Sequence, residues 1–196
     1  MPAARPARAP RSDNRLPLIL DEAARLFRGR GFHGTSVRDI VAAVDMLPGS
    51  LYYHFPTKEA LLAAVYAEGV RRISDAVESA VAGKDDPWER LEAACIAHLE
   101  ALLEESDYAQ VVIRVRPADA PSVERELVKL RDEYERLFAE LVQSLPLART
   151  TDRRSLRLML LGALNWSQTW YRPGRETPRT LARRFVALLR EPLEKQ

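Results

Sequence analysis

The sequence predicts an all-α protein of about nine helices: a small N-terminal three-helix domain containing a helix-turn-helix, followed by a larger C-terminal helical domain. Apolar residues recur with helical spacing along nearly the whole chain, and Gly and Pro residues separate these stretches. The one β-like run, residues 111–113, is too short and isolated to predict a sheet. Of the 196 residues, 46% are hydrophobic, which is enough to form a core.

The first predicted helix begins near Leu16, with Pro17 in the first turn, where no backbone N–H is needed. Glycines at 29, 31 and 34 end this helix. The second helix begins at Thr35 or Ser36, because Ser36 and Asp39 have the spacing of a capping box.

A third, very short helix is predicted to begin at Pro48, after a turn over residues 45–47. Phe55 and Pro56 end it, and Thr57 caps a fourth helix that starts near Lys58. Two short helices joined by a tight turn are typical of a helix-turn-helix.

Further helices are predicted over residues 88–105, 122–145, 153–171 and 179–190, with a short helix six between the first two of these. We therefore divide the chain into a flexible basic arm (1–14), a helix-turn-helix domain (15–60) and a larger helical domain (61–196). Basic residues outnumber acidic ones in the first 60 residues and after residue 147, whereas acidic residues dominate between them.

Several classes of protein are excluded by composition and motif. A lone Cys95 cannot form a disulfide within the chain, which favours the cytoplasm. No apolar run is long enough for a membrane span, and the N-terminus lacks the apolar core of a signal peptide. The three histidines have no metal-ligand spacing, so we expect no metal, and a G-x-G-x-x-G match over residues 29–34 follows a helix instead of a strand. We therefore expect that the protein is not an enzyme and binds no cofactor.

The third helix concentrates side chains that suit DNA binding. Tyr52 and Tyr53 are adjacent, and neighbours on a helix point about 100° apart, so both cannot face one core. Hydroxyl and imidazole groups reach phosphates, and tyrosine rings pack on thymine methyl groups. The candidate DNA contacts are Thr35, Ser36, Pro48, Gly49, Ser50, Tyr52, Tyr53, His54 and Lys58.

The runs GFHGTSVRDI (31–40), PGSLYYHF (48–55) and KEALL (58–62) resemble the DNA-binding domain of TetR/AcrR-type transcription regulators. The resemblance covers residues 15–66 and places Thr35, Gly49, Tyr52, Tyr53, His54 and Lys58 at DNA-contacting positions. The sequence departs from the family pattern in the turn, where Asp45 replaces a glycine, Met46 replaces a small apolar residue and Leu47 replaces a capping hydroxyl residue. Asp tolerates a left-handed turn, whereas the loss of the cap costs about 1 kcal/mol.

The resemblance also implies that the C-terminal domain senses a small molecule and that helices eight and nine form a homodimer interface. Both helices carry more apolar residues than a monomer core needs, notably Met159, Leu160, Leu164, Phe185 and Leu188. A twofold dimer presents two DNA-binding helices about 34–36 Å apart, which matches a palindromic operator.

The stretch Asn165–Pro173 is similar to that of a TetR-type subgroup whose members respond to acyl-coenzyme A thioesters. Trp166 and Trp170 share one helix face, and two readings remain open for them: packing in a core or dimer interface, or the wall of a pocket with polar anchors. Arginines after residue 147 suit the phosphates of such a ligand. The candidate ligand-binding residues are Tyr66, Val70, His98, Leu102, Asn165, Trp166, Trp170 and Arg172.

These patterns predict a repressor that binds a palindromic operator as a dimer and is released by a small molecule, such as an acyl-CoA thioester or another hydrophobic acid. Two alternatives stay open. Met46 and Leu47 would suit a helical ligand- or partner-binding protein whose DNA-binding domain has fallen out of use. An activator would carry the same features, since only the position of the operator distinguishes it from a repressor.

Overall fold

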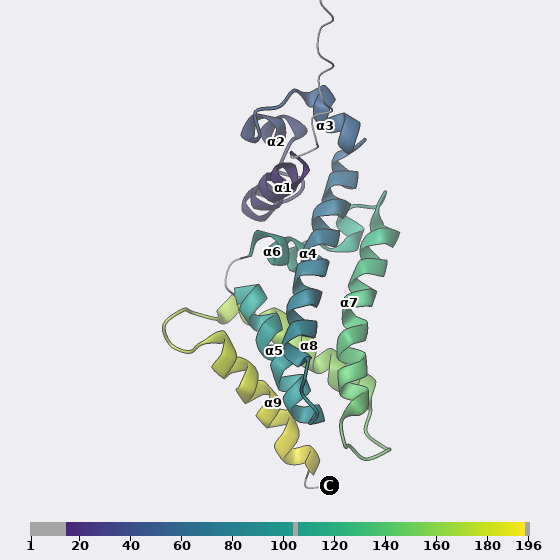
Figure 1. Cartoon of the computed structure of the whole chain (residues 1–196), viewed down its shortest axis with the longest axis vertical. Coiled ribbons are helices and arrows are strands. Elements are labelled where there is room, and N and C mark those ends of the chain that lie inside the picture. The colour runs from purple at the N-terminus through teal and green to yellow at the C-terminus, as the bar shows by residue number, and fades with distance from the viewer. Residues whose placement is uncertain (1–14, 104–105, 195–196) are drawn as a thin grey trace, which may run out of the picture.

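The computed structural model describes residues 15–103 and 106–194, and these form nine α-helices and one 3₁₀ turn, with no strand among them. Three short helices sit at one end of an elongated molecule, and the longer helices form a bundle beneath them (Figure 1). The all-α prediction is therefore confirmed. The predicted arm, residues 1–14, lies outside the described residues.

The N-terminal domain consists of α1 (Leu16–Arg30), α2 (Val37–Ala43) and α3 (Pro48–His54). Each boundary follows from local chemistry. Proline stands in the first turn of α1 and of α3. Gly31, at φ 74°, ends α1 in a conformation that costs glycine little. Ser36 and Asp39 form the predicted capping box at the start of α2.

The long helix α4 (Lys58–Val81) runs from the N-terminal domain into the bundle, and its first turn is capped by Thr57. The short α6 (Asp107–Arg114) lies beneath α1 and against α4 (Figure 1). Gly69 permits this close packing, because a Cβ at this position would lie 2.7 Å from Val112 and 2.9 Å from the Tyr108 carbonyl oxygen.

The rest of the bundle contains α5 (Pro87–Leu103), α7 (Glu124–Ser144), α8 (Arg153–Trp170) and α9 (Pro178–Glu194), with the 3₁₀ turn η1 (Pro117–Asp119) after α6. The helix α9 packs along α5, where Arg183 and Arg179 pair with Glu92 and Glu100 at 3.1 Å each. The predicted helices are all present, with ends shifted by a few residues, and η1 was not predicted because its three residues carry no periodic pattern.

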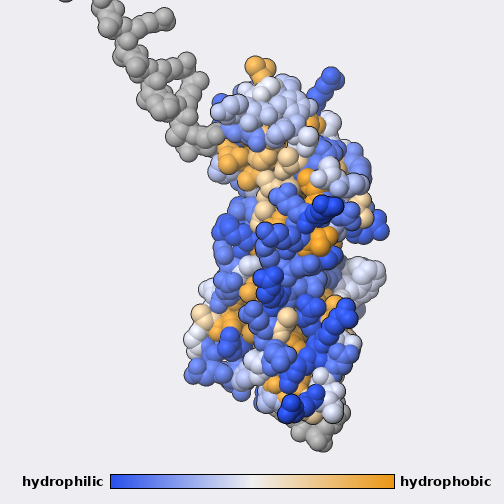
Figure 2. Space-filling model, turned by 90° about the vertical axis from the view of Figure 1, so that its right-hand side faces the viewer, coloured by the Kyte–Doolittle hydropathy of each residue, from blue (hydrophilic) through white to orange (hydrophobic). Residues whose placement is uncertain are grey.

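Buried apolar residues from every helix join into one core that continues from the N-terminal domain into the bundle. The surface in Figure 2 is largely hydrophilic, with scattered apolar groups at the N-terminal end and along the bundle. Across the described ranges, no helix has the length and apolar character needed to cross a membrane.

Candidate nucleic-acid interface and ligand cavity

The turn between α2 and α3 is formed by residues that depart from the usual glycine. Asp45 has φ 48°, and no other non-glycine residue in the described ranges has a positive φ. Asp adopts this left-handed conformation more readily than most residues. The Met46 N–H then donates to the Val41 carbonyl at 2.9 Å. The prediction that aspartate preserves this turn is confirmed.

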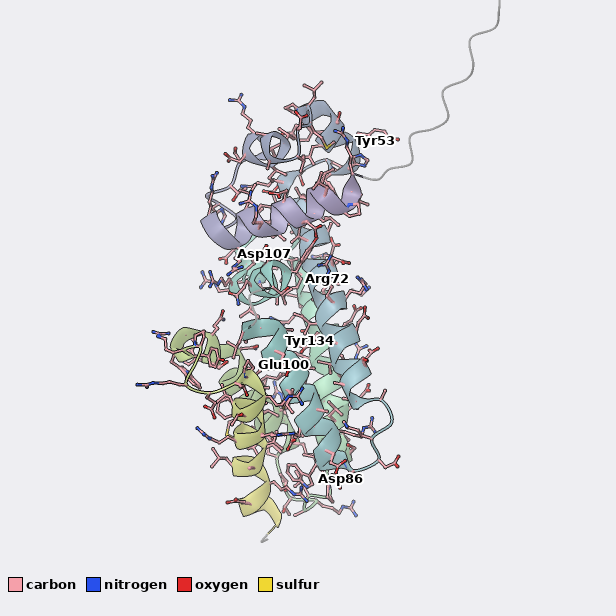
Figure 3. The ribbon with its side chains drawn as sticks, turned by 60° about the vertical axis from the view of Figure 1, so that its left-hand side comes forward. Tyr53, Arg72, Asp86, Glu100, Asp107 and Tyr134 are labelled. Atoms are coloured by element: carbon pink, nitrogen blue, oxygen red, sulfur yellow. The ribbon has the colours of Figure 1, made fainter. Side chains whose placement is uncertain are left out.

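The outer face of α3 is open to solvent. Leu51 is 2% exposed and anchors the helix, whereas Tyr52 is 49% and Tyr53 is 86% exposed. Pro48, Gly49 and Ser50 are exposed too. Figure 3 shows Tyr53 at the end of the molecule, pointing away from the helices. The helix thus presents two phenol groups and a small-residue surface that a DNA groove could accept.

Leu47 lies directly before α3 and is 76% exposed. Its backbone has the extended conformation of an N-cap residue, but its side chain offers no acceptor to the helix. The helix therefore begins without a side-chain cap, as the sequence predicted. The exposed isobutyl group contacts no core and is free to meet an apolar partner.

Thr35 lies inside the N-terminal domain, which corrects the expectation that its side chain meets a phosphate. The residue is 1% exposed, and its hydroxyl donates to the carbonyl oxygens of Leu26 at 3.2 Å and Gly31 at 2.9 Å. A buried hydroxyl must satisfy its hydrogen bonds internally, and Thr35 does so by joining α1 to the start of α2.

Lys58 also has internal partners that the sequence did not indicate. Its Nζ donates to the carbonyl oxygens of Phe32 and Thr35, both at 2.9 Å, and lies 4.3 Å from the centre of the Phe32 ring. An ammonium group has three donors, so this arrangement leaves one for another partner. Lys58 therefore holds the α1–α2 turn against the start of α4.

Ser36 and His54, the remaining predicted DNA contacts, differ in accessibility. Ser36 is exposed, and its Oγ donates to Asp39 at 2.6 Å while accepting from the Asp39 N–H at 3.2 Å. The Ser36 hydrogen bonds lower the pKa of Asp39, which keeps the cap charged. His54 is half-buried, and its ring lies 5.3 Å from that of Tyr53.

Polar contacts join the N-terminal domain to α6. The Tyr108 hydroxyl donates to Asp21 at 2.8 Å, and Arg28 pairs with Asp107 at 2.8 Å. Arg72 of α4 lies 4.1 Å from the centre of the Tyr108 ring. Figure 3 shows Asp107 and Arg72 at this junction, directly below α1. The orientation of the N-terminal domain is therefore tied to the position of α6.

A cavity of about 260 Å³ lies between α4, α5, α6, α7 and α8. Three of the eight predicted ligand-binding residues line it, namely Tyr66, His98 and Asn165. The other lining residues are Ile73, Val112, Ile113, Val115, Arg116, Pro117, Arg131, Tyr134, Glu135 and Leu161. Most of these additions belong to α6, η1 and α7, segments whose sequence gave no sign that they face a cavity.

His98 is the centre of a hydrogen-bonded network at the cavity wall. Its Nδ1 lies 2.6 Å from the Tyr134 hydroxyl and its Nε2 lies 3.0 Å from the Asn165 Oδ1. Burial lowers the pKa of His98 to about 4, so the ring is neutral at physiological pH. Figure 3 shows Tyr134 inside the bundle, between the helices.

Five predicted ligand-binding residues lie elsewhere. Val70 and Leu102 are buried in the core and are not part of the cavity lining. Trp166 is 67% and Trp170 is 46% exposed on the outside of α8, and Arg172 is exposed beyond it. Neither tryptophan lines the cavity, so of the two readings the structure favours packing in a dimer interface over a place in the pocket wall. Asn165 faces the cavity, and its neighbour Trp166 must point about 100° away from it.

Several arginines after residue 147 have structural partners. Arg153 donates to the carbonyl oxygens of Val142, Leu145 and Leu147 and so closes the end of α7. Arg157 pairs with Glu135 at 3.2 Å. These two cations stabilise the bundle and are already occupied.

The chain matches two family models. Residues 19–65 match the model described as bacterial regulatory proteins of the tetR family, and residues 84–193 match the tetracyclin repressor-like C-terminal domain. The HTH-type transcriptional repressor KstR2 of Mycolicibacterium smegmatis is 31% identical over 166 residues, which span 80% of this chain and 78% of that protein. KstR2 of Rhodococcus jostii is 29% identical over 185 residues, covering 89% of each protein.

Among solved structures, that of AibR in complex with isovaleryl coenzyme A and operator DNA has a TM-score of 0.76 and 27% identity, covering 88% of this chain and 96% of AibR. The two family models together span most of the sequence and coincide with the three-helix domain and the bundle. The chain therefore belongs to the TetR family of bacterial regulatory proteins, whose members bind DNA to regulate transcription and are not enzymes.

Proposed function

We propose that this protein is a ligand-responsive transcriptional repressor that binds a palindromic operator through α3 and leaves it when a small molecule enters the cavity. The observation that carries the proposal is the exposed face of α3, where Tyr52 and Tyr53 project from a helix anchored by Leu51. Neither tyrosine belongs to the buried core, and both groups suit phosphate and base contacts.

Substitution of the exposed tyrosines tests the DNA-binding surface. We expect Tyr52→Ala and Tyr53→Ala each to weaken operator binding at least tenfold, measured by fluorescence anisotropy, while the melting temperature stays unchanged. An operator can be selected from a random duplex library, and a scrambled duplex reports nonspecific binding. Undiminished operator binding by both variants would remove α3 from the interface.

We propose that two copies associate through α8 and α9. Large apolar side chains are exposed on the outside of both helices: Leu158, Met159, Trp166, Trp170 and Leu188. Gly162, in the middle of α8, has open space around its Cα, which allows a second helix to approach closely. Burial of such side chains in a dimer would remove an apolar face from water.

The cavity between α4 and α8 is the proposed effector site, with an acyl-CoA thioester or another hydrophobic acid as ligand. Support comes from the mainly apolar lining, the few polar groups of the cavity and the similarity to AibR, whose structure holds isovaleryl coenzyme A. Since α4 and α6 both line the cavity and both reach the N-terminal domain, a ligand can change the orientation of α3 through them.

A thermal-shift screen of acyl-CoA thioesters, free acids and apolar drugs, followed by operator release, tests the effector role. A ligand that binds the native state raises the melting temperature. If no compound in the panel releases the operator from the protein, the repressor does not respond to ligands of this class.

We place the protein in the cytoplasm, where its DNA target lies and where the buried thiol of Cys95 stays reduced.

A further inference from the structure

We propose that the cavity binds a short acyl group whose carbonyl oxygen accepts hydrogen bonds from the side chains of Tyr66 and Asn165. This inference rests on the proposed effector site and narrows its ligand to a size and a chemical class. It follows from three properties of the cavity: which polar groups are already paired, which are not, and how much space remains.

The His98 network fixes how Asn165 faces the cavity. A neutral imidazole has one donor and one acceptor. Because the Asn165 Oδ1 is an acceptor, His98 Nε2 must carry the proton, and Nδ1 then accepts from the Tyr134 hydroxyl. The Asn165 carbonyl is thereby occupied. Its NH₂ group has no hydrogen-bond partner within residues 15–103 and 106–194, so this group can donate to a ligand in the cavity.

Tyr66 provides a second donor. The residue is 1% exposed and lines the cavity, and no side chain or backbone group of the described ranges forms a hydrogen bond with its hydroxyl. Burial raises the pKa of Tyr66, so the phenol keeps its proton. The hydroxyl is not sealed in the core, so a ligand oxygen in the cavity can take the place of water as its acceptor.

The one carboxylate of the lining is already engaged. Glu135 pairs with Arg157 at 3.2 Å and with Arg131 at 3.7 Å. Arg131 and Arg116 also line the cavity, and each already pairs with a carboxylate, Arg131 with Asp132 at 2.9 Å and Arg116 with Asp119 at 3.2 Å. The groups left for a ligand are therefore the two neutral donors, Tyr66 and Asn165. They select an acceptor such as a carbonyl or carboxylate oxygen and disfavour amines and alcohols that need an acceptor.

The volume limits the acyl chain. A cavity of about 260 Å³ is slightly smaller than the roughly 300–1,000 Å³ of sites that hold drug-sized ligands. Ile73, Val112 and Leu161 give it apolar walls. A short acyl chain suits a cavity near the lower limit of ligand sites better than a fused ring system does, and the coenzyme A part of a thioester would extend outward past the Arg116 side chain, which is 82% exposed.

Calorimetric titration of the full-length protein separates carbonyl recognition from general apolar binding. The ligands are a five-carbon branched acyl-CoA, the matching CoA thioether without the carbonyl oxygen, and the free acid. We expect the thioester or the free acid to bind at least tenfold more tightly than the thioether, and the better of the two identifies the source of the carbonyl. Equal binding of thioether and thioester would overturn the proposal.

Two variants test the donors. Tyr66→Phe should lower the affinity for carbonyl-bearing ligands at least tenfold and leave the affinity for the thioether within twofold of wild type. Asn165→Asp keeps an oxygen for His98 but removes the NH₂ donor, and it should have the same effect. The matched control is Tyr171→Phe, because that hydroxyl bonds to the Glu176 carbonyl away from the cavity. Unchanged carbonyl-ligand affinity in both donor variants would refute the assignment.

Chain length tests the size limit. Wild-type affinity should fall at least tenfold from five-carbon to twelve-carbon or ring-bearing thioesters, and Leu161→Ala should shift the preference to longer chains. Tightest binding by a ring-bearing thioester would overturn the size class. The operator-release assay separates this inference from the proposed function. If the ligands that release the operator bind with an affinity that does not depend on Tyr66 and Asn165, only this inference fails. If no ligand releases the operator, the proposed function fails.

Discussion

The hydroxyl of Tyr108 donates a 2.8 Å hydrogen bond to Asp21, and this contact joins α6 of the bundle to α1 of the N-terminal domain. Arg72 of α4 reinforces it, lying 4.1 Å from the Tyr108 ring centre and 3.6 Å from the Asp21 carboxylate. The following residues of α6, Val112 and Ile113, line the cavity. The short helix α6 thus lines the proposed effector cavity and also contacts the N-terminal domain.

Tyr108→Phe should weaken communication between the two domains. We expect the effector-induced loss of operator affinity to shrink several-fold, with cavity binding within twofold of wild type and a stability loss of about 1 kcal/mol. The control is Tyr171→Phe, which loses a 2.8 Å bond from a tyrosine hydroxyl to the Glu176 backbone carbonyl inside the larger domain. Operator titrations with and without effector measure the response, and an undiminished response in Tyr108→Phe would rule out this route.

Lys58→Met should destabilise the N-terminal domain. The substitution removes two 2.9 Å hydrogen bonds to the backbone carbonyls of Phe32 and Thr35, and we expect a loss of about 2 kcal/mol in the free energy of unfolding. Urea denaturation measures it, with the exposed Lys129→Met as control at under about 0.5 kcal/mol. Weakened operator binding at unchanged stability would instead mean that Lys58 acts mainly on DNA.

Leu47→Ser should strengthen the start of α3. The backbone of Leu47, at φ −81° and ψ 146°, already has the N-cap conformation, so a serine oxygen can accept from the first turn. We expect a gain of about 0.5–1 kcal/mol in thermal or chemical denaturation. Leu47→Ala removes the exposed side chain without supplying a cap. Equal stability of Leu47→Ser and Leu47→Ala would show that the missing cap does not limit the stability of α3.

Leu188→Glu should disrupt the proposed dimer. Leu188 is 64% exposed on α9, and a charge at the centre of an apolar interface would have to be desolvated there. Light scattering after size exclusion should show a monomer with weaker operator binding, since the two linked DNA contacts are lost. Leu18→Glu, at a 46% exposed leucine of α1, is the control. A persistent dimer in Leu188→Glu would move the interface elsewhere.

Acid should destabilise the protein through His98. Its pKa falls from 6.5 in the unfolded chain to about 4 in the fold, because burial disfavours the charged ring. Between these pH values the unfolded state binds more protons, so this contribution is complete above pH 6.5 and is lost as the pH falls toward 4. It amounts to about 3 kcal/mol over that window.

His98→Gln isolates this effect from the carboxylates, several of which also lose stabilising interactions in acid. The variant should be less stable at neutral pH and should show a flatter decline between pH 6.5 and 4, measured by urea denaturation at each pH. Parallel pH profiles for wild type and variant would show that His98 does not titrate in this way.

Local chemistry made much of the N-terminal domain predictable. The capping box of Ser36 and Asp39, the proline that opens α3 and the left-handed Asp45 all act within a few residues, so the sequence specifies them directly. Helix geometry alone showed that Tyr52 and Tyr53 cannot both face the core, and the structure shows that both are exposed. Thr35 and Lys58 were assigned to DNA by their positions, and packing turned both inward.

The sequence by itself determined the helices, their caps and the exposed side of α3, because these depend on interactions between residues three or four positions apart. Only the tertiary structure decided which residues line the cavity and how they are paired. His98 meets Asn165 across 67 positions and Tyr108 meets Asp21 across 87, and the amphipathic pattern of α6 and α7 does not show which of their residues line a cavity. Such contacts arise when whole helices pack against one another, and no local pattern encodes which faces will meet.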